Sequence, residues 1–257
     1  MMSPKQWLIA CFDRSVESVG FQETFRRLIA WSGTELEVSG SYERLMADLK
    51  HQSVLVVSNH PSEFDSLAMF ASLPEKRNYT VMGNAMWCNL SRHTDRYLHP
   101  LYIASHVHAN GVNFVGRLFN RLLPMPVFPY EEEKRRNIHS LALASKKLHA
   151  NGLLWITPGR RSLSGSWYPG VGRILAKVSR RVFVVRLYIE GTSDWDYWRI
   201  FPLTGKVLPR VRLHFAEPYL YHPGDDPYAI TTELEEHYRG WLREFLALGD
   251  DQNLPAI

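Results

Sequence analysis

The chain has 257 residues, of which 45% are hydrophobic and 22% are charged, so it holds enough apolar material for one sizeable core. Proline and glycine are scattered along it, which excludes a low-complexity chain. Its formal net charge of +4 favours acidic partners, namely nucleic acid, anionic lipid or a phosphorylated small molecule, without choosing among them.

Cysteine usage and hydropathy indicate the compartment. The two cysteines, Cys11 and Cys88, form no Cys-x-x-Cys pair and suggest no disulfide framework. The apolar stretch at residues 7–12 ends at Asp13, too soon for a signal-peptide core, and no apolar run reaches the ~18–20 residues that a membrane-spanning helix needs. We expect a cytoplasmic protein, either soluble or bound peripherally to the inner face of the membrane.

Residues 1–35 predict a helical N-terminal extension. Apolar residues recur at helical spacing from Trp7 to Trp31, with Gly20 as a break. The pattern fits a helix or hairpin packed on the core. It also fits an interfacial helix on an anionic membrane, because Arg14, Arg26 and Arg27 accompany the aromatic residues.

Residues 36–257 predict one α/β domain. Strands are expected at residues 36–38, 53–58, 80–83, 153–156, 182–189 and 211–215, and helices at 42–49, 63–73, 131–151, 172–179 and 231–248. Residues 87–123 show no clear pattern, and 125–129 fit a short strand or an extended loop. The alternation predicts a mixed, largely parallel sheet flanked by helices, with functional loops at the strand ends.

His60 and Asp65 lie five positions apart, on either side of a predicted strand-to-helix turn. The buried strand holds the backbone of His60, and the first helical turn lets the carboxylate of Asp65 fold back toward the imidazole. A carboxylate on one ring nitrogen fixes the tautomer and makes the other nitrogen a better proton acceptor. That arrangement suits a general base that deprotonates an alcohol or amine, and it needs no serine nucleophile.

Other chemistries lack their signatures. The sequence has no Gly-x-Ser-x-Gly elbow, no Walker-type glycine loop and no nucleic-acid module, so we expect no serine hydrolase, no nucleotide-triphosphate site and no nucleic-acid partner. Four histidines, at positions 93, 99, 106 and 108, lack a cysteine or acidic partner at ligand spacing. We therefore expect neither a metal site nor a cofactor.

The motifs taken in order resemble the glycerolipid acyltransferase superfamily, the lysophosphatidic acid acyltransferase-like proteins. Residues 59–65, from Asn59 through His60 to Asp65, match that family's Asn-His-x-x-x-x-Asp block. Residues 156–162 resemble its third block, usually Phe-Pro-Glu-Gly-Thr-Arg-Ser. Residues 36–40 resemble the strand and glycine that commonly come before the Asn-His-x-x-x-x-Asp block, and residues 182–191 resemble the fourth block, a strand with a Val-Pro-Val-like core. Residues 215–218 resemble the closing strand.

The resemblance implies transfer of a fatty acyl group from acyl-CoA or acyl carrier protein to a hydroxyl of a lysophospholipid or glycerol-phosphate-type acceptor. His60 would be the base and Asp65 its orienting partner. The substrate-binding residues would be these five: Asn59, Gly159, Arg160, Arg161 and Ser162.

Departures from the family pattern leave alternatives open. The third block lacks its glutamate, because Pro158 is followed directly by Gly159, and Thr157 replaces the usual Phe. The second block, around residues 125–130, lacks its arginine, and Phe183 stands where the fourth block often has proline. The same chemistry could therefore act on an amine or a non-phosphorylated lipid. A lipid-binding protein with little catalysis is the rival from another class.

Overall fold

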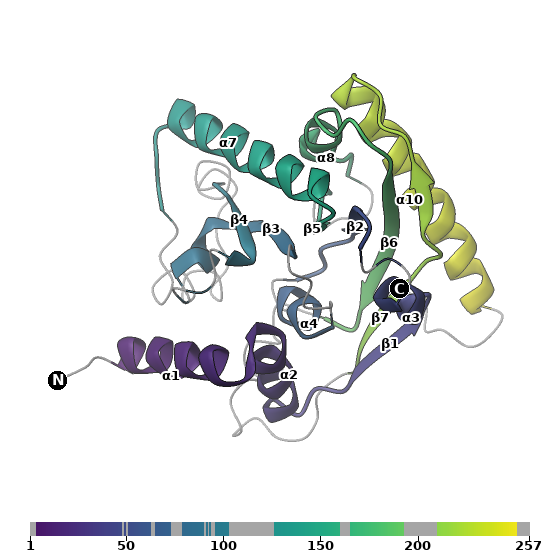
Figure 1. Cartoon of the computed structure of the whole chain (residues 1–257). Helices are drawn as coiled ribbons and strands as arrows, with labels where there is room; N and C mark the ends of the chain where they lie inside the picture. Colours follow the sequence, from purple (N-terminus) through teal and green to yellow (C-terminus); the bar gives the residue numbers. More distant parts are fainter. Residues whose placement is uncertain are drawn as a thin grey trace.

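The computed structural model describes residues 4–47, 49, 51–62, 65–72, 79–89, 91, 93, 96–102, 126–159, 165–192 and 210–250. Within these residues an eight-stranded sheet lies between two layers of helices (Figure 1). The strands are β1 (Leu36–Gly40), β2 (Val54–Ser58), β3 (Thr80–Asn84), β4 (Leu98–Leu101), β5 (Leu153–Ile156), β6 (Val182–Glu190), β7 (Val211–Phe215) and β8 (Tyr219–Tyr221). The helices are α1 (Pro4–Val19), α2 (Phe21–Trp31), α3 (Tyr42–Ala47), α4 (Asp65–Ser72), η1 (Ala85–Asn89, a 3₁₀ helix), α7 (Tyr130–His149), α8 (Gly170–Leu175) and α10 (Pro227–Asp250).

The sheet is mixed and largely parallel, which confirms the predicted fold class. Its order is β1-β7-β6-β2-β5-β3-β4, with β8 beside β6. The run from β6 through β2, β5 and β3 to β4 is parallel, whereas β7 and β8 are antiparallel to β6. The carboxyl ends of the five parallel strands therefore meet at one edge of the sheet, where loops in α/β proteins carry function.

Each face of the sheet is covered by its own helices. Strands β2 and β5 are buried on both faces, as their continuous apolar sequences predict. Val54, Val56 and Trp155 pack in one cluster with α2 and α4, whereas Leu55 and Val57 pack in a second with α7, α8 and α10. Figure 1 shows the latter three helices together on one side of the sheet. The two clusters make a three-layer α/β/α arrangement.

The N-terminal segment folds as two helices that meet at Gly20, where φ is +92° and the chain turns. Phe21 and Phe25 of α2 are buried against Phe70 of α4. Trp7 and Trp31 remain more than half exposed, at 52% and 55%. The segment thus combines a packed helix with exposed tryptophans, while the division of the chain at residue 35 remains a prediction.

The sequence did not predict strands β4 and β8, and it left open whether residues 125–129 form a strand or an extended loop. β4 falls in the segment that gave no clear pattern, and β8 has only three residues. Residues 126–129 form no strand and lead directly into α7, so the extended-loop alternative is correct there.

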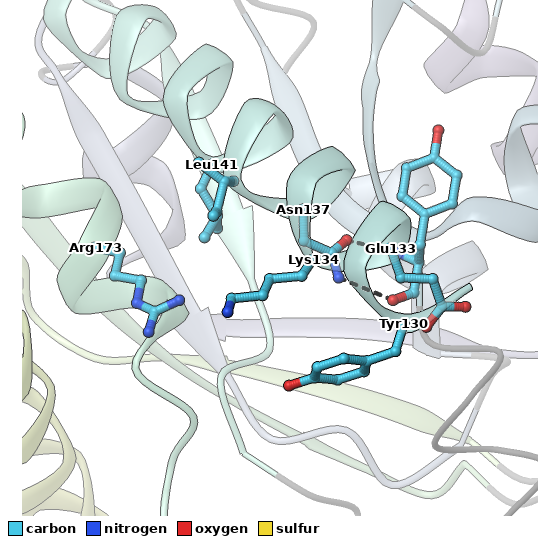
Figure 2. Close-up of a pocket in the computed structure, with 8 residues that line it drawn as sticks. Tyr130, Glu133, Lys134, Asn137, Leu141 and Arg173 are labelled. Atoms are coloured by element: carbon cyan, nitrogen blue, oxygen red, sulfur yellow. Dashed lines mark hydrogen bonds between the residues drawn. The ribbon is translucent and has the colours of Figure 1, made fainter. Parts of the chain in front are cut away.

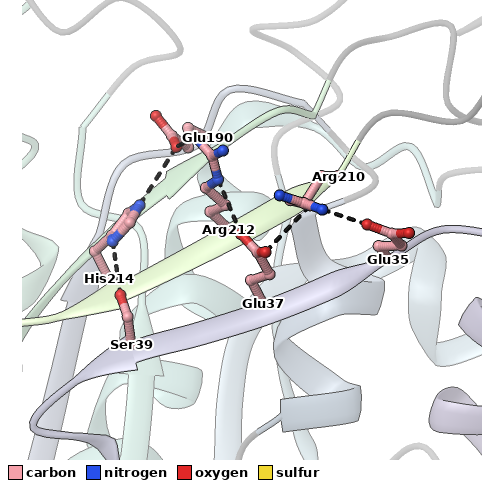
Figure 3. Close-up of polar contacts among 7 residues, drawn as sticks. All are labelled: Glu35, Glu37, Ser39, Glu190, Arg210, Arg212 and His214. Atoms are coloured by element: carbon pink, nitrogen blue, oxygen red, sulfur yellow. Dashed lines mark hydrogen bonds and ion pairs between the residues drawn. The ribbon is translucent and has the colours of Figure 1, made fainter. Parts of the chain in front are cut away.

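The β1 edge of the sheet carries a ladder of charged side chains. Arg210 pairs with Glu35 and Glu37, and Arg212 pairs with Glu37 and Glu190, all within 3.1 Å (Figure 3). These pairs join β1, β7 and the end of β6. Their side chains are partly exposed, so each pair contributes at most ~1 kcal/mol, and the ladder mainly selects the register of the edge strand.

His214 extends the ladder. Its Nδ1 lies 2.7 Å from Ser39 Oγ and its Nε2 lies 3.4 Å from Glu190 Oε1 (Figure 3). Gly40 is the last residue of β1 and has a φ of +76°. A Cβ at this position would lie 2.0 Å from the Phe215 carbonyl oxygen of β7. Any other residue at position 40 would have to displace the β1–β7 pair.

Candidate functional site

The candidate site begins at the carboxyl end of β2. All five residues of that strand are buried, and it pairs with β6 on one side and β5 on the other. Ser58, its last residue, accepts a hydrogen bond from the indole Nε1 of Trp155 on β5 at 2.8 Å. The backbone that enters Asn59 and His60 is therefore fixed by two neighbouring strands.

His60 and Asp65 meet as the sequence predicts. His60 Nδ1 lies 2.8 Å from Asp65 Oδ2; the carboxyl side chain is fully buried, and the imidazole is 24% exposed. Asp65 is the first residue of α4, where the helix dipole favours a negative charge. A carboxylate only accepts, so Nδ1 carries the proton, and in the neutral ring the lone pair lies on Nε2. This geometry suits the predicted role of His60 as a general base oriented by Asp65.

Asn59 is directed toward β6. Its Oδ1 accepts from the Ile189 amide, and its Nδ2 donates to the Ile189 carbonyl, each at 2.8 Å. The side chain thus reproduces a backbone pairing just beyond the end of β2. These bonds hold the His60 loop against β6, and the substrate contact that the resemblance implies for Asn59 stays a prediction.

Tyr238 of α10 supports the same loop from the opposite face of the sheet. Its hydroxyl donates to the Leu187 carbonyl at 2.9 Å and accepts from the Asn59 amide at 3.1 Å. The side chain is 3% exposed, and burial raises the pKa of Tyr238 far above its ordinary value. The hydroxyl consequently stays protonated and remains a donor to Leu187.

The loop after β5 lies beside the His60 loop. β5 pairs in register with β2, so Val57 lies opposite Ile156, and Gly159 follows Ile156 by as many residues as His60 follows Val57. A Cβ on Gly159 would lie 3.1 Å from the Trp167 indole, so this loop folds closely on itself. Arg160, Arg161 and Ser162 lie outside the described residues.

α10 ties the end of this loop to the His60 loop. Glu235 accepts a hydrogen bond from the Trp167 amide at 3.0 Å, and Arg239 donates to the Gly165 carbonyl at 2.8 Å. The Trp167 and Tyr238 rings pack with centroids 5.4 Å apart. One helix therefore holds both strand-end loops, and it does so from residues that the sequence analysis did not single out.

Of the four histidines considered for metal binding in the sequence, two lie within the described residues and two lie outside them. Among the residues that the structure describes, no group of three His, Cys, Asp or Glu side chains is placed to hold a metal ion. His99 is buried on β4, and His93 lies 3.6 Å from Glu17. His106 and His108 lie outside the described residues.

Of the described helices, none is both long and apolar enough to cross a bilayer.

Comparisons with known proteins find similarity at the level of solved structures. No family model matches the chain, and no curated protein matches it. Among solved structures it is similar to the 1-acyl-sn-glycerophosphate (LPA) acyltransferase PlsC of Thermotoga maritima, with 17% identity over 93% of this chain and 81% of that chain and a TM-score of 0.44. A likeness at this TM-score adds nothing to the functional argument, which depends on the geometry of His60, Asp65 and the loops around them.

Proposed function

We propose that the chain is an acyltransferase that moves a fatty acyl group from acyl-CoA or acyl carrier protein to a hydroxyl of a lysophospholipid or glycerol-phosphate-type acceptor. The observation that supports this most is the 2.8 Å contact between His60 Nδ1 and Asp65 Oδ2 at the carboxyl edge of a parallel sheet. It agrees with the Asn-His-x-x-x-x-Asp motif in both residue type and geometry.

The proposed reaction proceeds by direct transfer. His60 Nε2 takes the proton of the acceptor hydroxyl while the oxygen attacks the thioester carbonyl, and Asp65 stabilises the imidazolium that forms. The tetrahedral intermediate then collapses as the carbon–sulfur bond breaks. The leaving thiolate takes the proton from the imidazolium, which returns His60 to its neutral form. Asp65 stays ionised throughout, and Asn59 holds the loop through Ile189.

The loop after β5 is the proposed acceptor site. Gly159 permits close backbone approach, and the guanidinium groups of Arg160 and Arg161, with Ser162 next in the sequence, suit a phosphate. Losing one charge-assisted contact typically costs ~1.5–3 kcal/mol, so Arg160→Ala or Arg161→Ala should raise the acceptor KM roughly tenfold or more. If neither variant changes it, the phosphate-bearing acceptor is wrong.

We also propose peripheral contact with an anionic membrane through the N-terminal helices. Trp7 and Trp31 are exposed, and Arg14, Arg26 and Arg27 are exposed on the same two helices. Tryptophan inserts at the headgroup level while arginine contacts lipid phosphate. Flotation with phosphatidylglycerol vesicles should recover the protein at low salt and less at high salt. A protein that stays unbound at low salt would remove this proposal.

An amine or a non-phosphorylated lipid is the second candidate acceptor, because the third block lacks its glutamate after Pro158. Mass spectrometry of products from an acyl thioester and a panel of lysophospholipids, neutral monoacylglycerols and amines separates the candidates. The appearance of lysophospholipid product supports the main proposal, whereas acylated amine or neutral lipid supports the second. Thioester binding without any product points to a lipid-binding protein.

Two substitutions test the mechanism. His60→Ala should lower turnover by about 10²–10⁴, the range for removing a general base, and His51→Ala, an exposed histidine in the turn before β2, is its matched control. Asp65→Asn keeps the size but removes the charge, so turnover should fall with little change in donor affinity. Wild-type turnover in His60→Ala would show that the proposed chemistry is wrong.

A further inference from the structure

A cavity of about 140 Å³ lies between α7, α8 and the chain that leaves β4. Tyr102 follows β4 directly, Lys134 and Asn137 lie in the first half of α7, and Arg173 lies in α8 (Figure 2). The volume exceeds what a single water needs and suits a phosphate group rather than a whole nucleotide.

Two cations line this cavity from different helices. Figure 2 shows the Lys134 ammonium and the Arg173 guanidinium directed into the same space. Neither makes an ion pair or side-chain hydrogen bond with another residue in the described ranges. Arg135 and Arg136, by contrast, lie next to Lys134 in α7, and both pair with Glu132. Two like charges that converge without a carboxylate between them favour an anionic ligand.

The other polar groups of the cavity are directed elsewhere. Asn137 accepts from the Tyr102 amide at 2.8 Å and donates to the Tyr102 carbonyl at 2.9 Å, which fixes the wall of the cavity. The carboxylate of Glu133 points away from the two cations in Figure 2. Tyr130 is 60% exposed at the mouth and offers a flat apolar surface beside the cations. The ligand indicated is therefore a phosphate carried on a larger organic group.

Such a phosphate could belong to a glycerol-phosphate acceptor or to coenzyme A, and the distance from the cavity to the His60 loop distinguishes the two. β4 is parallel to β2 and three places from it, so the Tyr102 end of the cavity opens at the same sheet edge as His60. Three strand spacings put the Tyr102 wall of the cavity roughly 14 Å from β2 along the sheet. A glycerol-phosphate acceptor holds its phosphate only a few bonds from the hydroxyl that is acylated. Coenzyme A, by contrast, separates its thioester from its phosphates by the length of the pantetheine arm.

We infer that Lys134 and Arg173 bind a phosphate of coenzyme A, and that the pantetheine arm runs from this cavity along the sheet edge to His60. The inference rests on the proposed acyltransferase function. It assigns the donor to α7 and α8, whereas the proposed acceptor site lies in the loop after Gly159. Lys134 and Arg173 are binding residues here and take no part in the chemical step.

Calorimetric titration of the full chain with adenosine 3′,5′-bisphosphate, the phosphate-bearing end of coenzyme A, tests this without turnover. The wild type should bind, and Lys134→Ala and Arg173→Ala should each raise Kd roughly tenfold to a hundredfold, the range for one charge-assisted contact. Both side chains are exposed, so both variants should fold. Lys146→Ala, which removes an exposed charge from the last turn of α7, is the matched control and should bind as the wild type does.

Titrations with glycerol 3-phosphate and acyl-transfer assays separate the outcomes. The donor site is supported if Lys134→Ala and Arg173→Ala bind glycerol 3-phosphate with the Kd of the wild type, and if both variants have a raised KM for acyl-CoA. If instead these variants lose glycerol 3-phosphate, the cavity serves the acceptor and the inference is overturned. Acyl transfer from acyl-CoA with no nucleotide binding at Lys134 and Arg173 also overturns it but leaves the proposed function intact. If no thioester is used at all, the proposed function fails as well.

Discussion

Replacing Tyr238 with phenylalanine should weaken catalysis from the far side of the sheet. The change removes one hydroxyl that donates to the Leu187 carbonyl at 2.9 Å and accepts from the Asn59 amide at 3.1 Å. The ring fills the same space, so packing against Trp167 should survive. The substitution therefore tests the hydrogen bonds alone.

The size of the effect follows from burial. Leaving a buried polar group without its partner costs about 1–3 kcal/mol, and we expect the lower part of that range because Asn59 is only half-buried. Asn59 precedes His60 directly, so part of this loss should appear as greater mobility of the imidazole of His60, the proposed general base. A misplacement of about 1 Å can cost up to a hundredfold in rate, and we expect turnover to fall about tenfold.

Tyr221→Phe is the matched control. It removes a hydroxyl from an equally buried ring, one that donates to Glu233 at 2.7 Å, away from the strand-end loops. Urea unfolding should show comparable losses of stability in Tyr238→Phe and Tyr221→Phe, and the rate of acyl transfer should fall only in the first. Wild-type turnover in Tyr238→Phe, or an equal fall in Tyr221→Phe, would refute the proposed support of His60.

Two further predictions concern stability. Gly172→Ala places a Cβ 1.8 Å from the Pro227 carbonyl oxygen, so urea unfolding should show that the free energy of unfolding falls by about 1–3 kcal/mol. In Gly240→Ala the new Cβ has nothing within 4 Å, so the free energy of unfolding should rise by up to about 1 kcal/mol. Shifts of the same sign in the two variants would contradict this. Burial, aided by nearby positive charge, lowers the pKa of His99 from 6.5 to about 4, so as the pH falls from 6.5 to 4 the unfolded chain takes up a proton that the folded chain does not. At about 1.4 kcal/mol per pKa unit, and less because solvent screens part of the ring, His99 should lower the free energy of unfolding by up to about 3 kcal/mol across that window. The His99→Gln variant should lack this loss over the same pH range. Equal losses in the wild type and His99→Gln would show that other groups are responsible.

The His60–Asp65 pair could be predicted because its geometry is local. The two residues flank one strand-to-helix turn, and the apolar sequence of β2 reveals the strand that holds them. The support from Tyr238 could not be predicted in the same way, since it joins residues 179 positions apart. The helical period marks Tyr238 as part of the buried face of α10, but not where its hydroxyl would bond.

Strands were missed where their sequences carry weak signals. β4 contains Pro100, which a central strand rarely tolerates, but within the described part of the chain β4 is the last strand of the sheet, so a missing amide on the side away from β3 costs no ladder bond there. β8 is three residues long and depends on its pairing with β6. α10 begins at Pro227, earlier than its apolar periodicity indicates, because Asp226 caps it through the Tyr228 amide at 2.9 Å.

The arrangement of α10 explains how a site of short loops is kept rigid. Glu235, Tyr238 and Arg239 are three and four residues apart, so they project from one face of the helix. That face bonds the loop after β5 at Trp167 and Gly165 and the loop after β2 at Asn59. The separation between His60 and the proposed acceptor loop is therefore set by one rigid element rather than by either loop. The missing glutamate of the third block therefore need not disturb His60. The hydrogen bonds between the loop after β5 and α10 lie beyond that block, at Gly165 and Trp167.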